Sequence, residues 1–403
     1  MRHGLGHILI GLWGALVSAS AASQPVEPAA AQWSIIDGHS DFAIHYMRTS
    51  PPWSVAAYDL RVRLPGQADI PRWRAGRVGG MLVTVASDRP PSASGHFPRL
   101  LASLDWLDAL VARHADDLAP AGSLAELRAA RAAGRIVLIA AIEGGDQIDG
   151  SLDNLRAAYQ RGVRSMLIVY DHHNAIGDGA MVLEQSRAAT GPRNGGLTPF
   201  GRRVIAEMNR LGMIVDLSHA DETTALQAMS LSRAPVIFSH SGARAHADTA
   251  RNLSDRALRA LRANGGIVMV PLARYLTTTA HWRWWSSGEA RHAELVAIHG
   301  EEHPAVSTGM AAWDAANPEP EVTVAHVADQ IEYVARVAGH AHVGIGSDFD
   351  GMGRFAIPAL ADASRLPILF AELARRGWTD AQLHALASGN FERVFGAVEA
   401  AAD

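Results

Sequence analysis

Short apolar runs recur along the chain and alternate with segments in which apolar residues have a helical spacing. Most of these runs are continuous rather than alternating, as is typical of strands that are buried on both faces of a parallel sheet. The segments between them predict helices, several of which end at glycine. The eight runs are WSIIDGHSD, VGGMLVTVAS, RIVLIAAIEGG, GVRSMLIVYDHHN, GMIVDLSHA, APVIFSHSG, GGIVMVPLA and HVGIGSDFDG. Eight strands that alternate with helices predict an α/β fold, the (β/α)8 TIM barrel.

Two segments interrupt this alternation. A long helical stretch is expected over residues 99–134, after the second strand. A second segment, at about residues 274–320, follows the seventh strand and contains the run HWRWW. We interpret this insertion either as a lid or oligomer contact, or as a packed surface segment without a further role. The predicted organisation is a single (β/α)8 domain over residues 33–403 that carries this insertion.

The N-terminus has the layout of a secretory signal peptide. Arg2 precedes an apolar stretch from Ile8 to Val17, and the small residues from Ala19 to Ala21 fit a cleavage site. The apolar stretch is short for a bilayer span, although an uncleaved anchor remains the alternative. We therefore expect a cleavable signal peptide over residues 1–22 and a linker over residues 23–32. The mature protein would be periplasmic or secreted, with no stable membrane anchor.

The composition excludes several classes of site and partner. A formal net charge of -5 gives no electrostatic reason to expect nucleic acid as a partner. The chain has no cysteine, which excludes disulfides, thiolate zinc sites and a cysteine nucleophile. It also has no lysine, so a carbamylated lysine cannot bridge two metal ions. Any dinuclear site must therefore use a carboxylate bridge.

Potential metal ligands follow the predicted strands at the point where each strand ends. In a TIM barrel these carboxyl ends meet at one mouth, where the active site lies. A single histidine at a strand end is more often a hydrogen-bonded loop residue than a ligand. Here, however, such residues follow most of the strands, and burying many ionisable groups together without a cation would be costly. The residues at the strand ends are His39, Asp41, Glu143, Asp171, His172, His173, His219, His240, Asp348 and Asp350.

The number and type of these residues favour two metal ions. His39 and Asp41 are two positions apart, so on an extended strand their side chains point the same way and suit one ion. The ligand-type residues outnumber the three protein ligands of a usual catalytic zinc, which favours two ions that share a carboxylate. Histidines and carboxylates without sulfur suit Zn²⁺, while Mn²⁺, Co²⁺ and Fe²⁺ stay open.

These motifs together carry a family resemblance. The stretches IDGHSD, IEGGDQIDGSL, GLTPFGRRVIAEMNRLGMIVDLSH, PVIFSHSGAR, RNLSD, NGGIVMV and GIGSDFDG occur in this order along most of the chain. The chain closely resembles the membrane (renal-type) dipeptidase family, peptidase family M19 of the amidohydrolase superfamily, here as a secreted bacterial member. The resemblance implies a binuclear zinc site in a (β/α)8 barrel and favours a homodimer.

The resemblance also implies ligand roles. His39 and Asp41 would hold one ion, His219 and His240 the other, and Glu143 would bridge them. A water or hydroxide between the ions would be the nucleophile, with its pKa lowered by the metals.

Two further residues receive roles from the resemblance. Asp348 would relay a proton from the water to the leaving amine. Arg251, in RNLSD, would pair with the free carboxylate of the substrate, a task that suits a planar guanidinium. Without the resemblance, Arg251 would be read as a solvated arginine and Asp348 as a turn residue.

The loop after the fourth strand departs from the family pattern. Family members carry a histidine there that contacts the substrate and the developing oxyanion. Aligned on Asn174, that position falls on Tyr170 or Asp171, and the two histidines His172 and His173 come later. Either His172 or His173 takes over this role, which is what we expect, or the role is lost; we count all four residues of the loop as candidate substrate contacts.

Three functions are compatible with the sequence. The leading one is metal-dependent hydrolysis of dipeptides, with C-terminal D-residues included among the substrates that the family tolerates. The second keeps the metal site but acts on a specialised periplasmic peptide, such as a siderophore precursor. The third is a non-catalytic binding protein on the same scaffold, against which the intact set of ligand residues argues.

Overall fold

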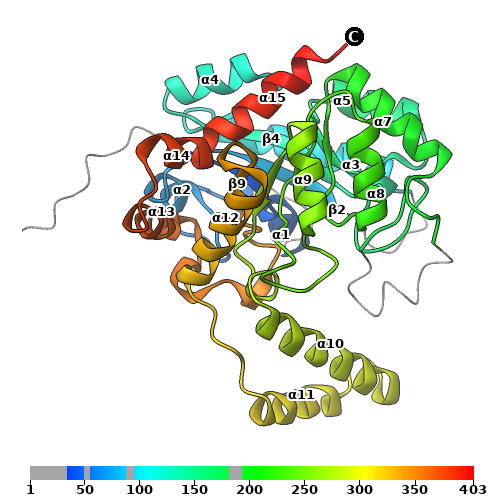
Figure 1. The fold of residues 1–403 in the computed structure, drawn as a ribbon, viewed down its shortest axis with the longest axis vertical. Helices are drawn as coiled ribbons and strands as arrows, with labels where there is room; N and C mark the ends of the chain where they lie inside the picture. The colour runs from blue at the N-terminus through cyan, green and yellow to red at the C-terminus, as the bar shows by residue number, and fades with distance from the viewer. Residues whose placement is uncertain (1–33, 50–54, 88–94, 181–192) are drawn as a thin grey trace, which may run out of the picture. The chain divides into compact units, whose positions relative to one another are not determined.

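The computed structural model describes residues 34–49, 55–87, 95–180 and 193–403 (Figure 1). By its internal contacts the chain divides into two units, Met1–Gln32 and Trp33–Asp403, and everything below concerns the second. The expected signal peptide and linker lie outside the described residues. Within those residues, none of the helices combines the length and apolar character that crossing a bilayer requires.

Eight parallel strands close into a barrel. Each strand pairs with its neighbours in chain order, and pairings of β1 with both β2 and β9 complete the circle. The prediction of a (β/α)8 TIM barrel is confirmed. The strands are β1 (Ile35–Ser40), β2 (Val78–Ser87), β4 (Ile136–Glu143), β5 (Ser165–Leu167), β6 (Ile214–Asp216), β7 (Ile237–Phe238), β8 (Ile267–Val270) and β9 (Val343–Ile345).

A ninth strand lies outside the circle. Strand β3 (Leu118–Pro120) pairs with the first residues of β4, between helices α3 (Phe97–Arg113) and α4 (Leu124–Ala132). The expectation of one helical stretch over residues 99–134 was therefore wrong. Pro120 cannot continue a helix, and the buried ring of His114 accepts a hydrogen bond from the Leu60 amide at 3.1 Å. The first helix ends just before His114, and Pro120 disfavours a helix over the residues of β3.

The barrel strands are buried on both faces, as their continuous apolar runs predict. Along β4, Val137, Ile139 and Ala141 belong to a cluster that also takes residues from β1, β2, β6, β7 and β8. The alternate positions Ile136 and Leu138 pack in the larger cluster beneath the surrounding helices. Helix α15 (Asn390–Ala400) joins the inner cluster near the strand starts. That end of the barrel is thereby closed, and the carboxyl ends are left for a site.

The helices around the barrel begin and end at the residues that favour such ends. The side chains of Thr198, Asp221 and Ser254 accept hydrogen bonds from the first turns of α7, α8 and α9. Helices α7 and α9 end at Gly212 and Gly265, which have left-handed φ. The helices are α1 (Phe42–Thr49), α2 (Ile70–Ala75), α5 (Leu152–Gln160), α7 (Pro199–Leu211), α8 (Glu222–Leu231), α9 (Asp255–Asn264), α12 (Val324–Ala338), α13 (Leu366–Arg375) and α14 (Asp380–His384), with a π-helical turn (Ala385–Gly389) before α15.

The segment after β8 forms a helical hairpin. Helices α10 (Thr279–His299) and α11 (Pro304–Ala316) run side by side and stand apart from the helices around the barrel (Figure 1). They approach closely where they carry glycine, because a Cβ at Gly288 would lie 3.1 Å from the Trp313 ring. The residues of the expected insertion thus have a packed structure of their own.

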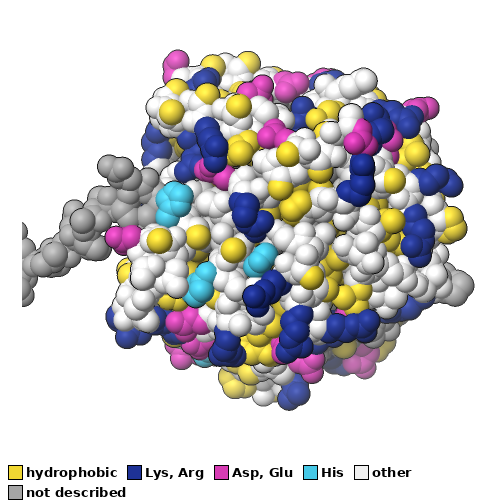
Figure 2. Space-filling model, turned by 45° about the horizontal axis from the view of Figure 1, so that its top comes forward, with side chains coloured by type: hydrophobic (Ala, Val, Ile, Leu, Met, Phe, Trp, Pro, Cys, Tyr) yellow, Lys and Arg dark blue, Asp and Glu magenta, His cyan; other side chains and the backbone are white. Residues whose placement is uncertain are grey.

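Exposed apolar side chains are sparse on the described part of the surface. Large exposed apolar side chains among the described residues are few and far apart in the sequence, namely Val62, Leu231, Ile298 and Ile368. On the face drawn in Figure 2, apolar side chains are scattered among charged and polar ones. Single exposed apolar residues of this kind are normal for a folded protein.

Candidate active site

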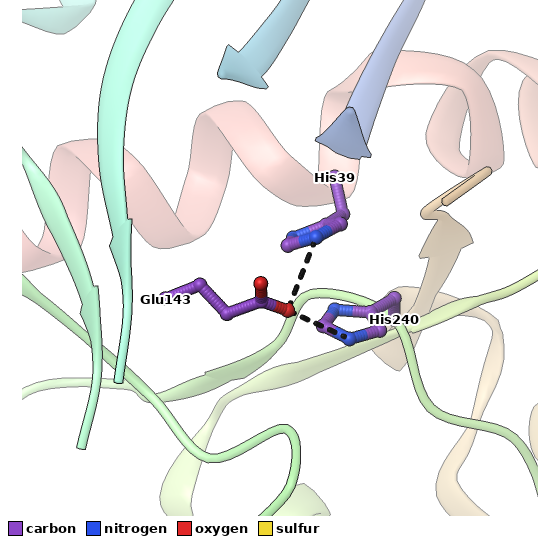
Figure 3. A group of neighbouring side chains, drawn as sticks. All are labelled: His39, Glu143 and His240. Carbon is purple, nitrogen blue, oxygen red and sulfur yellow. Dashed lines mark ion pairs between the residues drawn. The ribbon is translucent and has the colours of Figure 1, made fainter. Parts of the chain in front are cut away.

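Glu143, the last residue of β4, lies at the centre of three histidines from three other strand ends. Its Oε1 atom lies 3.4 Å from Nε2 of His39, 3.5 Å from Nε2 of His219 and 3.7 Å from Nε2 of His240. Figure 3 shows the carboxylate between the rings of His39 and His240. The sequence predicted that these residues lie near one another only because they follow strands of one barrel. In the structure their side chains are in contact.

Two further carboxylates adjoin this group. Asp41 Oδ1 lies 3.3 Å from Nε2 of His39, and one possible ligand atom from each of His39, Asp41 and Asp348 falls within 4.8 Å of the others. The same holds for His39, Glu143 and His240. The two groups share His39, and all the residues in them are buried.

The donor set fits divalent cations. Asp41 Oδ1 is buried, and although His39 is near, none of the described residues makes a hydrogen bond to it. The Nε2 atoms of His219 and His240 face each other at 3.0 Å. Imidazole nitrogens and carboxylate oxygens that converge in this way are the ligands of zinc and similar metals. An ion would satisfy the orphaned oxygen and offset the cost of burying these charges.

The polypeptide itself shifts the proton affinities of these groups strongly. Burial raises the pKa of Asp348 to about 7, with the negative charges of Asp41 and Glu143 adding to the effect and His39 opposing it. Burial also lowers the pKa of His39, but the charges of Glu143 and Asp41 outweigh it and raise that pKa to about 10. Glu143 is held at a pKa of about 2, because His39 and His219 outweigh the effect of burial. Such large shifts are typical of functional sites.

Neighbouring polar groups orient the histidines. Asp171 Oδ1 lies 2.7 Å from Nδ1 of His219, and the Ser239 hydroxyl lies 3.0 Å from Nδ1 of His240. Both contacts leave Nε2 directed at Glu143. Carboxylates and hydroxyls behind a ligating histidine fix its tautomer and ring orientation. Asp171 therefore supports His219, a role that the sequence did not reveal because the two residues are 48 positions apart.

Two site residues adopt left-handed backbone conformations. His219 has φ of 68° and Asp348 has φ of 64°, although neither is glycine. Residues of this kind cost on the order of 1–3 kcal/mol and persist where the surrounding structure over-determines them. In both cases the residue with left-handed φ lies shortly after the end of a barrel strand, β6 or β9. The backbone strain is thus found where two side chains turn into the mouth of the barrel.

A cavity of about 140 Å³ opens beside these groups. Expected site residues and unexpected ones share its lining. Gly351 is among the unexpected ones, and a Cβ there would lie 2.4 Å from Oδ1 of Asp348 and 2.7 Å from Oδ2 of Asp41, so a larger residue would displace these carboxylates. The lining residues are Asp41, Glu143, Tyr170, Asp171, His219, His240, Arg251, Tyr275, Leu276, Trp282, Trp285, Asp348 and Gly351.

The sequence profile of the family described as membrane dipeptidase (Peptidase family M19) matches residues 24–403. The chain belongs to this family. Among similar proteins, the dipeptidase aclJ of Aspergillus oryzae is 34% identical over 95% of this chain and 82% of its own, and the dipeptidase verJ of Clonostachys rogersoniana is 32% identical over 91% and 84%. The probable dipeptidase PvdM of Pseudomonas aeruginosa has the same fold, with a TM-score of 0.78 at 23% identity over 92% of this chain and 96% of its own.

Family membership makes the protein a metallo-dipeptidase, and the buried histidines and carboxylates at the barrel mouth are its candidate metal centre. The position of Arg251 is compatible with this activity. Its guanidinium is buried, donates from Nη1 to the Ser241 hydroxyl at 3.2 Å and lies 4.0 Å from Asp171 Oδ1. It also lines the cavity, so a positive group is available to an anionic ligand.

The structure does not place His172 and His173 in the cavity of this metallo-dipeptidase. His172 Nε2 lies 2.6 Å from Oδ2 of Asp146, and His173 Nδ1 lies 3.1 Å from Oδ1 of Asp178. The expectation that one of them faces the substrate therefore has no geometric support.

Asn174 explains why both histidines turn away. Its side chain donates to the Ile168 carbonyl and accepts from the amides of Ile176 and Gly177, so the loop bends back on itself. Tyr170 takes the position at the cavity instead, with its ring stacked on His219 at 4.4 Å between centroids.

Proposed function

We propose that this metallo-dipeptidase holds two zinc ions and hydrolyses dipeptides that have a free C-terminal carboxylate. The observation that carries the proposal is the contact of one Glu143 oxygen with three imidazole Nε2 atoms at 3.4–3.7 Å. A carboxylate in that position suits a bridge between two ions, which agrees with the absence of lysine. The proposed ligands are His39, Asp41, Glu143, His219 and His240.

The chemistry that bound divalent ions supply at such a site is the activation of a water molecule and the polarisation of the scissile carbonyl. Asp348 is the proposed acid and base. It lies beside Asp41 and His39 at the cavity, and burial raises the pKa of its carboxyl, which favours the uptake of a proton there. The proton would pass to the leaving amine.

Arg251 and Tyr170 are the proposed substrate contacts. The buried guanidinium of Arg251 would pair with the C-terminal carboxylate of the dipeptide, because it keeps N–H donors at the cavity. Tyr170 would face the scissile carbonyl in the place of the histidine that other family members carry. Burial raises the pKa of the Tyr170 hydroxyl well above its usual value, so it stays protonated and can donate.

The stereochemistry of the substrate belongs to the same proposal. A metallopeptidase of Rhodobacter sphaeroides with the same fold, 24% identical with a TM-score of 0.71 over 91% of this chain and 99% of its own, was crystallised with a phosphinate mimic of the dipeptide L-Ala-D-Ala. We accordingly include dipeptides with a C-terminal D-residue among the proposed substrates.

A direct test uses the purified protein after full zinc loading. It would be assayed for release of amino acids from a dipeptide panel that varies the stereochemistry of the second residue. Its metal content would be measured by plasma mass spectrometry. We expect two ions per chain and turnover that is lost on chelation and regained with zinc. Absence of turnover by the loaded protein over the whole panel would refute the proposal.

A second candidate function keeps the metal site and changes the substrate. Trp282 and Trp285 add an aromatic wall to the cavity, which favours a substrate more specialised than a generic dipeptide. Such a substrate would be a secreted peptide, for example a siderophore precursor. A deletion strain that uses dipeptides normally but accumulates an unprocessed secreted peptide would favour this function over the first.

Location and assembly complete the proposal. From the N-terminal sequence we propose export to the periplasm or the medium. Fractionation of cells that express the full chain, with N-terminal sequencing of the mature protein, tests the export. From family resemblance we propose a homodimer, and light scattering of the mature protein tests this oligomeric state.

A further inference from the structure

The cavity beside the metal centre has two chemically different walls. The barrel side is polar and charged, with carboxylates, imidazoles and the guanidinium of Arg251. The other side is formed by Tyr275, Leu276, Trp282 and Trp285, all of which lie in the segment that follows β8. The hairpin insertion therefore contributes an apolar wall to a site that is otherwise charged.

The aromatic side chains of this wall pack on one another. The rings of Tyr275 and Trp285 are stacked at 4.8 Å between centroids, and those of Trp282 and Trp285 lie 5.2 Å apart. Both tryptophans are only partly buried, so part of each ring remains open beside the cavity. A ligand side chain placed against them would remove apolar surface from water on both partners.

One carboxylate holds the two ends of the insertion together. Glu319 Oε1, just after α11, lies 2.5 Å from Nη1 of Arg274 and 2.7 Å from Nε2 of the buried His281 in the first turn of α10. In addition, Trp284 donates from its indole nitrogen to the Asn317 carbonyl at 2.7 Å. These contacts hold the base of the hairpin closed, so the aromatic wall has a defined place at the cavity.

We propose that Trp282 and Trp285 form a side-chain subsite of the dipeptidase and select dipeptides with one large apolar or aromatic side chain. The inference rests on the proposed hydrolysis of dipeptides and names the class of substrate for it. Because most of the remaining lining is charged or polar, an apolar side chain would be desolvated at lower cost against the tryptophans than against the barrel. Hydrophobic pockets of this kind discriminate between side chains by about 10- to 200-fold.

Matched dipeptides test the subsite in the zinc-loaded enzyme. The panel would contain Ala-Ala, Leu-Ala, Phe-Ala, Ala-Leu and Ala-Phe, and the quantity compared is the ratio of kcat/KM for each bulky dipeptide to that for Ala-Ala. We expect the wild type to favour a bulky residue at one of the two positions by about tenfold or more. Trp282→Ala and Trp285→Ala should reduce that ratio by about tenfold, mainly through KM.

A variant of a tryptophan outside the hairpin provides the control. Trp378 packs against His340 and does not line the cavity, so Trp378→Phe should keep the wild-type ratio. Circular dichroism and thermal unfolding would show that each variant folds, and Trp282→Phe and Trp285→Phe serve as milder replacements if an alanine variant does not.

A second readout does not depend on turnover. An uncleavable phosphinate dipeptide with a phenylalanine side chain should change the tryptophan fluorescence of the wild type and of Trp378→Phe on binding. The change should be smaller in Trp282→Phe and Trp285→Phe, since the proposed contact is with those two rings.

The outcomes separate this inference from the proposed function. Equal kcat/KM over the panel would overturn the subsite while leaving dipeptide hydrolysis intact. A rise in kcat/KM for bulky dipeptides in the alanine variants would show instead that the tryptophans exclude large side chains. No turnover of any dipeptide would overturn the proposed function, and with it the subsite.

Discussion

The Nδ1 atom of His219 lies 2.7 Å from Oδ1 of Asp171. The pKa of the Asp171 carboxyl is lowered, because the attraction of His219 outweighs the effect of burial. A charged carboxylate is the partner that suits a histidine whose Nε2 atom ligates a metal, because it accepts the Nδ1 proton and leaves Nε2 for the ion.

Replacing Asp171 should weaken metal binding. We expect Asp171→Asn to lower the affinity for zinc by about 10- to 100-fold, as measured by competition with a chromogenic chelator. Asp146→Asn is the matched control, since Asp146 lies beside His172 rather than beside a proposed ligand. If Asp171→Asn binds zinc as the wild type does, Asp171 does not support His219.

Replacing Tyr170 should affect turnover more than replacing either neighbouring histidine. Tyr170→Phe removes a hydroxyl from a residue that lines the cavity, and we expect kcat to fall by about 10- to 100-fold with the metal content unchanged. His172→Ala and His173→Ala should each change kcat by less than about threefold, because their rings pair with Asp146 and Asp178. A larger loss in a histidine variant than in Tyr170→Phe would contradict this placement of the loop.

Replacing Asp348 should abolish proton transfer but not folding. We expect Asp348→Asn to lower kcat by about 10²- to 10⁴-fold in steady-state assays of the zinc-loaded enzyme. Asparagine tolerates the left-handed φ of 64° at this position, so the backbone should be preserved. Asp350→Asn is the control in the same loop, because Asp350 also has positive φ but accepts a hydrogen bond from the Gln67 amide. Similar losses in both variants would indicate a structural effect of the loop.

Removing the metal should destabilise the fold. Asp41, Glu143 and Asp348 are buried close together, and without a cation their charges repel. Zinc at 100 times its dissociation constant would stabilise the folded state by about 2.7 kcal/mol. We expect chelation to lower Tm and zinc to restore it in differential scanning fluorimetry. A Tm that is the same with and without chelator would argue against a metal in this site.

Glu207 should stabilise the fold in a pH-dependent way. It is largely buried in α7, and its hydrogen bonds with Arg210 and Arg156 hold the pKa of its carboxyl at about 2, below the ordinary 4.5. A carboxyl with a lowered folded-state pKa contributes its full stability above pH 4.5 and loses it as the pH falls toward 2.

The variant Glu207→Gln checks this dependence. We expect it to lower the free energy of unfolding by about 1–3 kcal/mol at pH 7, as measured with urea. The difference from the wild type should be smaller at pH 3. A difference that stays constant or grows between pH 7 and pH 3 would show that the charge of Glu207 is not the cause.

The residues of the barrel mouth could be predicted because parallel strands impose their own order. All eight barrel strands are recognisable as apolar runs, and a closed parallel barrel brings their carboxyl ends to one place. His39, Glu143, His219 and His240 therefore meet whatever the loops between them do. Strand β3 escaped prediction because it has only three residues and pairs outside the circle.

The direction of loop side chains could not be predicted in the same way. His172 and His173 follow β5 at a somewhat greater distance along the chain than His219 follows β6, and they turn toward Asp146 and Asp178. Asn174 bends this loop through hydrogen bonds to Ile168 and Ile176, and nothing in the local sequence distinguishes that bend from a turn toward the cavity. Likewise, the run of tryptophans in α10 did not reveal which of its members reach the site.

The sequence by itself determined the barrel, the family and the candidate metal ligands that meet at the barrel mouth. The apolar runs of the strands are a local property of the sequence, and the common edge of parallel strands follows from the topology. Both can be predicted from the sequence alone. Only the tertiary structure decided that Asp171 supports His219, that Tyr170 rather than a histidine lines the cavity, and that Trp282 and Trp285 complete it. These outcomes depend on contacts between segments far apart in the chain, which fix the rotation of each side chain.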